Sequence, residues 1–354
     1  MRVAVIGAGL AGLAAAWELT QTDGYEVTVV ESERRAGGVI VTEHLQGFVV
    51  EGGPDGFLAG EPELPALARE LGIGDQVVNQ CARGTSLWTG KELAPVEEGR
   101  AAAVLGIEAK SADVAAGFRS FAAGMSQPVA ALSQRLAGAL RMGQRVAGLT
   151  RAGDGWRIAI AGGPTHEADG VVLALPAYGT APLLESVGVA GARALAEVVY
   201  VPSITVSLAY RAEQVEAPLT GAGFVVDQNN TAPLHLRACT YASSKFPGRA
   251  PAGRVLLRAF LAPGDGDPAT AAHAHLAAIL HLRGEPLWSR VFHWPRGLPR
   301  YQASHVDVLG EVRHGLAELP SIAIAGAGYD GAGVSACVRS GRAAARVIAR
   351  STAR

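Results

Sequence analysis

The chain has 354 residues, enough for two or three domain-sized units, and a formal net charge of only −1. This near-neutral balance does not favour a nucleic-acid partner, and 49% hydrophobic with 18% charged residues is typical of a compact globular enzyme. The three cysteines (Cys81, Cys239 and Cys337) are far apart and odd in number, which favours a reducing compartment and predicts neither a disulfide framework nor a metal site.

The first thirty-one residues read as strand, turn, helix and strand. The apolar run Arg2 to Ile6 leads into a GxGxxG turn at residues 7–12, and a second apolar run ends at Glu31. An acid at the end of the second strand can accept hydrogen bonds from an adenosine ribose. We include its neighbour, Ser32, in this predicted ribose site.

Each residue of the turn has a physical role in dinucleotide binding. Gly7 allows the tight turn, Gly9 lets the backbone approach a pyrophosphate, and Gly12 lets the helix pack close to the strand. Leu10 and Ala11 open the helix, whose free N–H groups and positive dipole end favour phosphate. The alternative, a glycine-rich turn without a ligand, leaves the acid at the end of the second strand unexplained.

A second glycine element follows closely. Arg35 precedes the pair Gly37 and Gly38, which supplies another close backbone approach to a diphosphate, and Arg35 could add charge there. Folds that bind NAD do not usually need this element, so it favours FAD as the cofactor. The alternative is that the glycine pair is a simple loop.

The next segments alternate between short strands and helices. Residues 48–57 predict a strand that ends in a glycine-rich turn, where Gly53, Pro54 and Asp55 are candidate cofactor contacts. Further predicted elements are a helix at 62–71, a hairpin at 86–93, a helix at 125–140, strands at 145–149, 156–160 and 170–176, and a helix at 180–184. Residues 97–121 have weak periodicity, and we assign no element to them.

The pattern changes after residue 198. Five β-rich runs, at residues 204–210, 223–227, 235–241, 254–261 and 289–293, predict a mostly antiparallel sheet with one helix at 269–282. We interpret this region as a substrate domain. A helix at 306–319 follows.

The C-terminal region repeats the nucleotide-binding pattern. A strand at 321–325 leads into a glycine-rich loop beginning at Gly326, and a helix begins at Val334. Two such units at opposite ends of the chain predict that both termini meet around one cofactor. The helix that starts at Val334 would then direct its positive end at a flavin ring and stabilise negative charge on the reduced flavin.

Two motifs are more specific than GxGxxG: a Glu-x-Gly-Pro-Asp-x-Phe turn at 51–57 and a Tyr-x-Gly-x-Gly-Val-x-x-Cys-x-x-x-Gly tail at 329–341. With them the chain resembles the flavin-dependent protoporphyrinogen/coproporphyrinogen oxidases of the wider flavin amine oxidase superfamily. The resemblance implies an FAD oxidase that takes six electrons from a porphyrinogen, two at a time, and passes them to oxygen in haem biosynthesis. It also implies that the backbone of Val146 contacts adenine.

The predicted fold is α/β, a Rossmann-like FAD-binding domain of the two-dinucleotide-binding-domain flavoprotein type with a second, mostly antiparallel sheet domain. We assign residues 1–85, 125–185 and 306–354 to FAD binding, 86–124 to a truncated helical segment, and 186–305 to substrate binding. Members of the family carry a long helical insertion in this position that lines the substrate cavity and often touches the membrane. We therefore expect a more open cavity and lost or weakened membrane association. A second subunit could cover the exposed patch.

A basic residue that in the family often follows the Gly-Pro turn, and holds a substrate propionate, is absent from residues 56–60. Lys245, Arg237, Arg249 or Arg258 could substitute for it, or they could be ordinary surface charges.

Hydride transfer to flavin N5 requires no nucleophile, metal or general base from the protein, and the sequence offers no such constellation. The candidate residues are therefore positioning residues. Phe246 matches a family aromatic that stacks on the macrocycle, or is a core aromatic. Tyr301 lies in a Tyr-Gln-x-x-His stretch also seen in the family and either positions substrate, as Lys245 could, or only packs. Cys337 could attach flavin, or be a buried small residue.

Three functions remain open: a porphyrinogen oxidase, an FAD oxidase or desaturase of another small molecule, and a non-catalytic FAD- or porphyrin-binding protein. Amine oxidases usually have a Gly-Glu step where this chain has Gly326-Ala327-Gly328, which disfavours an amine substrate. The expected partners are a porphyrinogen-like molecule and O2. No apolar run reaches membrane-spanning length, and a strand at residue 2 leaves no room for a signal peptide, so we expect a cytoplasmic protein.

Overall fold

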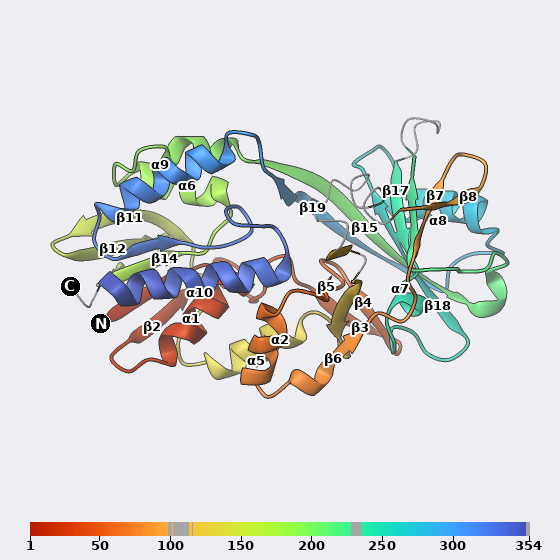
Figure 1. Cartoon of the computed structure of the whole chain (residues 1–354), viewed down its shortest axis with the longest axis horizontal. Coiled ribbons are helices and arrows are strands. Elements are labelled where there is room, and N and C mark those ends of the chain that lie inside the picture. The colour runs from red at the N-terminus through yellow and green to blue at the C-terminus, as the bar shows by residue number, and fades with distance from the viewer. Residues whose placement is uncertain (98–100, 102–112, 115, 228–234, 352–354) are drawn as a thin grey trace.

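The computed structural model describes residues 1–97, 101, 113, 114, 116–227 and 235–351 of the chain. Figure 1 shows two parts side by side, with both chain termini at the outer end of one part. The part with the termini is built on a parallel sheet, and the other on a larger, mostly antiparallel sheet. The predicted α/β class is confirmed.

The parallel sheet collects strands from the beginning, middle and end of the chain. Its order is β10 (Leu140–Arg141), β2 (Glu26–Val30), β1 (Arg2–Ile6), β14 (Gly170–Leu173) and β20 (Ile322–Ile324). Every neighbouring pair is parallel. Continuous apolar runs of this kind are expected in parallel strands, because helices cover both faces. The two predicted strand–glycine–helix units therefore lie in one sheet.

Helices α1 (Leu10–Thr20) and α10 (Val334–Ser351) pack against each other on one face of this sheet, as Figure 1 shows. Their approach is close: a Cβ atom on Gly341 of α10 would lie 2.1 Å from the carbonyl oxygen of Ala11. Helices α2 (Glu63–Glu70) and α5 (Gln127–Arg135) extend the same layer. The N- and C-terminal segments are thus held together by backbone-to-backbone packing that only glycine permits.

The opposite face is covered by helices α6 (Ala177–Glu185) and α9 (His305–Ala317) and by a small antiparallel sheet. That sheet consists of β11 (Val146–Ala152), β12 (Gly155–Ile160) and β13 (His166–Ala168). Short 3₁₀ helices lie at Gly74–Gln76, Ala192–Glu197 and Ala212–Gln214.

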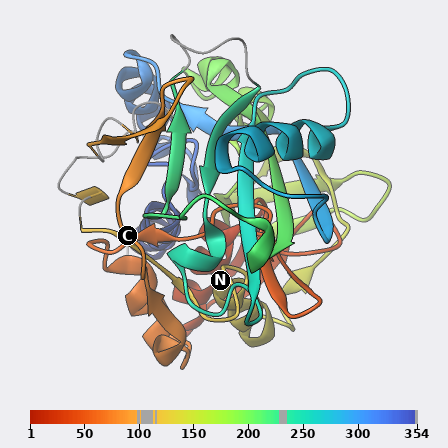
Figure 2. The ribbon, with the colours of Figure 1, turned by 90° about the vertical axis from the view of Figure 1, so that its right-hand side faces the viewer.

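The second part is a seven-stranded sheet. Its order is β19 (Trp288–Arg300), β15 (Val199–Arg211), β18 (Arg254–Leu261), β17 (Leu236–Thr240), β16 (Gly223–Val226), β7 (Thr85–Trp88) and β8 (Leu93–Val96). Only β16 and β7 are parallel. Helix α8 (Pro268–Leu280) lies across its outer face, as Figure 2 shows, and the short helix α7 (Ala242–Lys245) precedes β18.

Two small sheets join the parts. One is the hairpin of β3 (Thr42–Leu45) and β4 (Phe48–Glu51), and the other combines β5 (Phe57–Leu58), β6 (Val77–Asn79) and β9 (Phe118–Phe121). Strands β15 and β19, each of 13 residues, extend well beyond the predicted runs and reach from the seven-stranded sheet toward the parallel sheet (Figure 1).

Two local expectations differ from the structure. The helix predicted at 125–140 ends at Arg135, because the chain must turn at Gly138 to bring Leu140–Arg141 into the parallel sheet. The hairpin predicted at 86–93 is present, but it belongs to the seven-stranded sheet and not to a separate helical segment at 86–124. Most of the segment at 97–121, to which we assigned no element, lies outside the described residues.

Candidate active site

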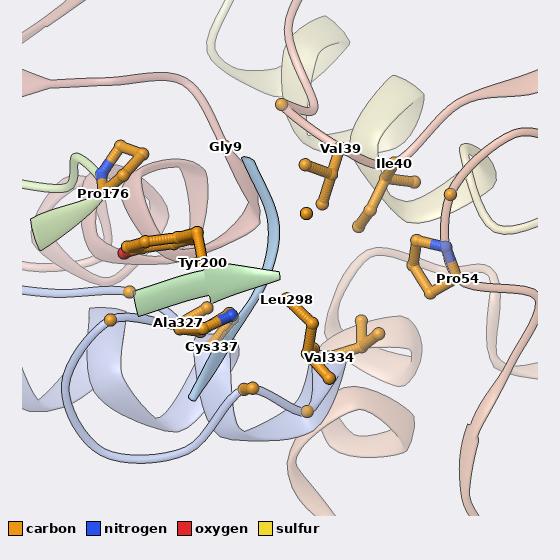
Figure 3. Close-up of a pocket in the computed structure, with 18 of the residues that line it drawn as sticks. Gly9, Val39, Ile40, Pro54, Pro176, Tyr200, Leu298, Ala327, Val334 and Cys337 are labelled. Atoms are coloured by element: carbon orange, nitrogen blue, oxygen red, sulfur yellow. The ribbon is translucent and has the colours of Figure 1, made fainter. Parts of the chain in front are cut away.

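A cavity of about 2100 Å³ lies between the two parts. Figure 3 shows Gly9, Pro54 and Val334, from three distant segments, around the same space. All but one of the predicted cofactor residues line it: Gly7, Gly9, Leu10, Ala11, Glu31, Ser32, Arg35, Gly37, Gly38, Gly53, Pro54, Asp55, Val146, Gly326 and Val334. The exception is Gly12, which packs against the backbone of Gly7 and does not line the cavity.

The glycines of the GxGxxG turn have three different environments. Gly7 has φ of +104°, a conformation that favours glycine. A Cβ atom on Gly12 would lie 1.9 Å from the carbonyl oxygen of Gly7, so helix α1 can pack on β1 only without a side chain there. A Cβ atom on Gly9 would meet no atom within 4 Å, and Gly9 lines the cavity. The open space beside Gly9 fits a diphosphate that approaches the backbone.

The second glycine element lies directly beside the first. Gly37 donates its backbone N–H to the carbonyl oxygen of Ala8 at 2.8 Å, and Gly9 and Gly37 form an isolated parallel bridge. The guanidinium of Arg35 donates to the carbonyl oxygens of Gly38 at 2.5 Å and of Ile40 at 3.3 Å. Arg35 therefore fixes the loop as well as adding positive charge to the cavity wall. Two adjacent glycine surfaces are the cradle that FAD requires.

The predicted ribose acid is held in place by the backbone. One carboxylate oxygen of Glu31 accepts a hydrogen bond from the backbone N–H of Ala8 at 2.7 Å, and the other accepts from the N–H of Glu33 at 2.8 Å. The oxygen that binds Glu33 also accepts a hydrogen bond from Ser32 Oγ at 3.1 Å, whereas the oxygen that binds Ala8 keeps a second lone pair for a ribose hydroxyl. Val146, the predicted adenine contact, lines the same cavity.

Tyr301 holds the C-terminal glycine loop. Its hydroxyl donates to the carbonyl oxygen of Ala327 at 2.5 Å and accepts from the N–H of Gly331 at 3.1 Å. Its ring stacks on His305 with centroids 4.3 Å apart, and His305 Nε2 lies 3.0 Å from the carbonyl oxygen of Tyr329. Tyr301 lines the cavity, as expected of a positioning residue, but its hydroxyl already binds the loop.

We therefore expect Tyr301→Phe to loosen the loop. The substitution removes both hydrogen bonds of the hydroxyl and leaves the Gly331 N–H and Ala327 carbonyl without them, at a cost of about 1–3 kcal/mol. Thermal unfolding of the FAD-loaded variant should begin at a lower temperature, and flavin release should be faster. Unchanged flavin release would contradict the assigned role, and Tyr25→Phe, remote from the cavity, is the control.

The Gly52–Asp55 turn is bound to the seven-stranded sheet. A Cβ atom on Gly53 would lie 1.8 Å from the carbonyl oxygen of Val39, so the turn packs tightly on the second glycine element. The carbonyl oxygen of Gly52 accepts hydrogen bonds from Thr205 Oγ1 and Trp294 Nε1, both at 2.9 Å, and from the guanidinium of Arg258. A cofactor-lining turn is thus fixed by side chains of β15, β18 and β19.

Beneath this turn lies a cluster of buried charges. Lys245 Nζ is 2.9 Å from a carboxylate oxygen of Asp55, and Arg249 Nη2 is 3.4 Å from one of Glu51. The exposed fractions of Lys245, Arg249 and Arg258 are only 9%, 2% and 4%. The interpretation of these three as ordinary surface charges is therefore wrong. The carboxylates of Asp55 and Glu51 balance part of the buried positive charge. Arg237, by contrast, is exposed on the cavity wall.

The two carboxyl groups of the cluster have pKa values shifted in opposite directions. Burial alone would raise the pKa of Asp55, but Lys245 and Arg258 lower it by more, and the net pKa lies below 3.8. Burial raises the pKa of Glu51 above 4.5 despite the nearby Arg249.

The depressed pKa of Asp55 predicts that acid removes part of the stability of the fold. Since the pKa of Asp55 is depressed in the folded state, its stabilising contribution is present above pH 3.8 and is lost as the pH falls through the lower folded value. Glu51 has the opposite sign: its contribution is present below pH 4.5 and is lost as the pH rises through the raised folded value. The free energy of unfolding of Asp55→Asn, measured by urea titration, should fall less between pH 6 and pH 3 than that of the wild-type protein. An equal loss would contradict the assignment.

Phe246 and Cys337, two further candidates from the sequence, have different environments. Phe246 is 1% exposed, does not line the large cavity, and packs with its ring centroid 5.2 Å from Lys245 Nζ. This position fits the core-aromatic interpretation. Cys337 lines the cavity, but burial raises the pKa of its thiol to about 12. A thiol held in its protonated form is a poor nucleophile, which disfavours flavin attachment.

Several cavity residues have no distinctive sequence pattern. Thr205 and Trp294 bind the Gly52 carbonyl only because β15 and β19 cross the boundary between the parts. The Tyr200 hydroxyl accepts a hydrogen bond from the N–H of Ala177 at 2.9 Å. Arg296 lies over the ring of Tyr178 at 4.1 Å, where β19 departs from regular pairing with β15. In the sequence, Pro295 and Gly297 on either side of Arg296 indicate that the strand is irregular at this point.

The described residues contain no group of three or more His, Cys, Asp or Glu side chains arranged to hold a metal ion. Among the same residues, no helix combines the length and the apolar character that crossing a bilayer requires.

A glycine cradle formed by both termini, beside a second sheet that closes a large cavity, defines an FAD-binding fold with a separate, mostly antiparallel sheet. The model of the family "Flavin containing amine oxidoreductase" matches residues 10–123 and 85–349, and the chain belongs to this family. It is an FAD-dependent oxidoreductase, and bound FAD supplies a two-electron acceptor.

Known proteins similar to this chain include two oxidases named for porphyrinogens. Coproporphyrinogen III oxidase of Bacillus subtilis (strain 168) is 23% identical, with 97% of this chain and 96% of the relative covered. The crystal structure of a putative protoporphyrinogen oxidase from Exiguobacterium sp. 255-15 superposes with a TM-score of 0.85 at 22% identity, covering 100% of this chain and 99% of the other. Putrescine oxidase with bound putrescine has a TM-score of 0.69 at 18% identity, with coverages of 99% and 100%.

The alignment with the Bacillus protein runs over 463 positions, more than the 354 residues of this chain. The relative therefore has internal segments that this chain lacks.

Proposed function

We propose that this protein is an FAD-dependent oxidase that converts a porphyrinogen, most readily coproporphyrinogen III, to the porphyrin, with O2 as the electron acceptor, in tetrapyrrole biosynthesis. The observation that carries the proposal is the charge of the cavity. Ten cationic side chains and only five carboxylates line it, although the whole chain has a net charge of −1. The cations are Arg35, Arg83, Arg145, Arg237, Lys245, Arg258, Arg296, Arg300, Arg313 and Arg339, and the carboxylates are Glu31, Glu33, Asp55, Glu61 and Asp330.

The cavity has more cationic side chains than the binding of FAD requires. The pyrophosphate of FAD brings two negative charges, which leaves cationic groups for a second anionic ligand. Arg237, Arg296 and Arg300 have no carboxylate within salt-bridge distance among the described residues. Coproporphyrinogen III has four carboxylates and protoporphyrinogen IX has two. The more highly charged substrate therefore fits the cavity better, in agreement with the names of the relatives.

The residues of the chain bind and orient both molecules. Gly9, Gly38 and Gly53 bring the backbone close to the cofactor, and the Gly52 turn is fixed by its hydrogen bonds to the sheet. Apolar side chains that line the cavity, including Phe260 and Leu298, offer packing surface to the pyrrole rings. Holding a reduced carbon near the flavin is the catalytic contribution that this arrangement provides.

Arg237 is the clearest candidate for binding a substrate carboxylate. It is the extra residue of a β-bulge, because Leu236 pairs with Leu261 and Ala238 with Phe260 on the adjacent strand. Bulges redirect side chains beside active sites. In this protein the bulge leaves Arg237 exposed on the cavity wall.

We expect Arg237→Ala to raise the KM for coproporphyrinogen III by roughly 10-fold or more, because a hydrogen bond to a charged group contributes about 1.5–3 kcal/mol. The KM for protoporphyrinogen IX, with fewer carboxylates, should rise less. Arg157→Ala, an exposed arginine of β12 away from the cavity, is the matched control. Equal KM values for Arg237→Ala and wild type would contradict this role.

The proposal is tested by aerobic assays of porphyrin fluorescence and oxygen uptake. Coproporphyrinogen III should be oxidised faster than protoporphyrinogen IX, and putrescine should not be oxidised, since a cationic cavity repels protonated amines. Oxygen uptake with putrescine, or none with either porphyrinogen, would overturn the proposal. Tight porphyrin binding without turnover would indicate the binding-protein alternative.

A further inference from the structure

A second, much smaller cavity lies beneath the Gly52–Asp55 turn, between the cofactor-lining segment and β15 and β18. Its volume is about 10 Å³, which is close to that of one water-sized sphere. Among the residues that line it are Glu51, Asp55, Ser207, Arg249 and Arg258, the core of the buried charge cluster. It is therefore a polar compartment inside the protein.

Three lining residues carry polar atoms without a hydrogen-bond partner in the described part of the chain. These atoms are Ser207 Oγ, Arg249 Nη1 and Arg258 Nε. The residues are only 1%, 2% and 4% exposed, so bulk solvent does not reach them. Buried polar groups almost always have a partner, because an unsatisfied group retains the full cost of its desolvation. Three such atoms around one small cavity indicate a missing common partner.

The other atoms of the two guanidinium groups are already bound. Arg249 Nη2 donates to Ser120 Oγ at 2.6 Å and faces Glu51 at 3.4 Å. Arg258 Nη2 donates to the carbonyl oxygens of Gly52 and Gly53. Ser207 and Arg258 lie directly opposite each other on β15 and β18. These contacts fix both arginines, so neither can turn its unpaired N–H to solvent.

We propose that this cavity is the binding site of a single structural water molecule. The water accepts hydrogen bonds from Arg249 Nη1 and Arg258 Nε and donates to Ser207 Oγ and to the carboxylate of Glu51. A halide ion would also accept from the arginines, but it is larger than the cavity and would face the carboxylates of Glu51 and Asp55. A water molecule both donates and accepts, which is what this mixed lining requires.

The water has a structural consequence for the active site. By linking Arg249 to Arg258 it completes the network that holds the carbonyl oxygens of Gly52 and Gly53, and this turn lines the cofactor cavity. It acts as a positioning element between the two parts of the protein. This role of the water does not depend on which substrate the protein binds.

A crystal structure of the FAD-loaded protein, grown without chloride and soaked in bromide, tests the site directly. We expect one ordered solvent peak within hydrogen-bond distance of Arg249 Nη1 and Arg258 Nε, without an anomalous signal. A bromide anomalous peak would show that the site binds a halide. The absence of any peak would show that the cavity is dry. Either result would overturn the proposal.

Two substitutions at one position give a second test in solution. Ser207→Ala leaves room for the water, whereas the larger side chain of Ser207→Val displaces it and leaves both arginine N–H groups unsatisfied. We therefore expect Ser207→Val to have a Tm lower than that of Ser207→Ala by about 2–4 °C or more. A dry cavity predicts the reverse order, because valine would fill the space and favours β-strands. A Tm for Ser207→Val equal to or above that of Ser207→Ala would overturn the proposal.

Discussion

Gly9→Val should fold like the wild-type protein but be purified almost without flavin. A Cβ atom at this position meets no protein atom within 4 Å, and the φ of −66° is accessible to any residue. The side chain would instead occupy the cavity space into which we place the FAD pyrophosphate. Because the phosphate can no longer approach the backbone N–H groups, we expect the Kd for FAD to rise at least about 100-fold, equivalent to roughly 2.7 kcal/mol.

Circular dichroism and the ratio of flavin to protein absorbance measure this result. Gly138→Val is the matched control, since Gly138 also has free space around its Cβ position but is remote from the cavity. Gly12→Val should differ from both, because its Cβ would lie 1.9 Å from the carbonyl oxygen of Gly7 and would prevent folding of the first unit. Normal flavin content in Gly9→Val would place the cofactor elsewhere.

Lys245→Met should destabilise the protein severely. The substitution keeps the length of the side chain but leaves the buried carboxylate of Asp55 without its partner at 2.9 Å. Removal of one partner from a buried ion pair costs about 3–5 kcal/mol, since the remaining charge is desolvated and uncompensated. We expect a comparable fall in the free energy of unfolding from urea titrations at neutral pH.

The double variant Lys245→Met/Asp55→Asn distinguishes a structural pair from a substrate contact. With both members of the pair replaced, neither Lys245 nor Asp55 is left as a buried charge without the other, so the double variant should be more stable than Lys245→Met alone. If Lys245 primarily binds a substrate carboxylate, Lys245→Met should instead keep wild-type stability and show only a higher KM. That outcome would contradict the assignment of Lys245 to the buried cluster.

The cofactor cradle is the part of the site that the sequence predicts best. Its determinants are local: Gly7, Gly9 and Glu31 belong to one strand–turn–helix–strand unit, and Gly326 and Val334 to a second. Each pattern implies a backbone shape by itself. The assignment of both units to one sheet needed only the rule that such units bind at the carboxyl ends of parallel strands.

The charge cluster was not predictable in the same way. Lys245 and Asp55 are separated by 190 positions in the sequence, and their pairing depends on the contact of helix α7 with the Gly52–Asp55 turn. Periodicity places a charged residue on an element but does not reveal a partner on a distant one. For the same reason the sequence did not distinguish the exposed Arg237 from the buried Arg249 and Arg258.

The extent of β15 and β19 was underestimated for a related reason. Their terminal residues, including Val199 and Arg300, pair with each other beyond an irregularity at Pro202, where the apolar alternation is lost. Sheet pairing rather than local pattern maintains the strands there. This extension carries Tyr200 and Leu298 into the cavity.

We propose that one cavity, closed by both chain termini, holds FAD beside an anionic porphyrinogen. Anaerobic addition of coproporphyrinogen III to the purified, FAD-loaded protein, monitored by flavin absorbance, tests it most directly. We predict that the flavin absorbance bleaches in proportion to added porphyrinogen and that porphyrin fluorescence appears in the same time course. A flavin that stays oxidised with excess porphyrinogen, yet is reduced by dithionite, would contradict the account.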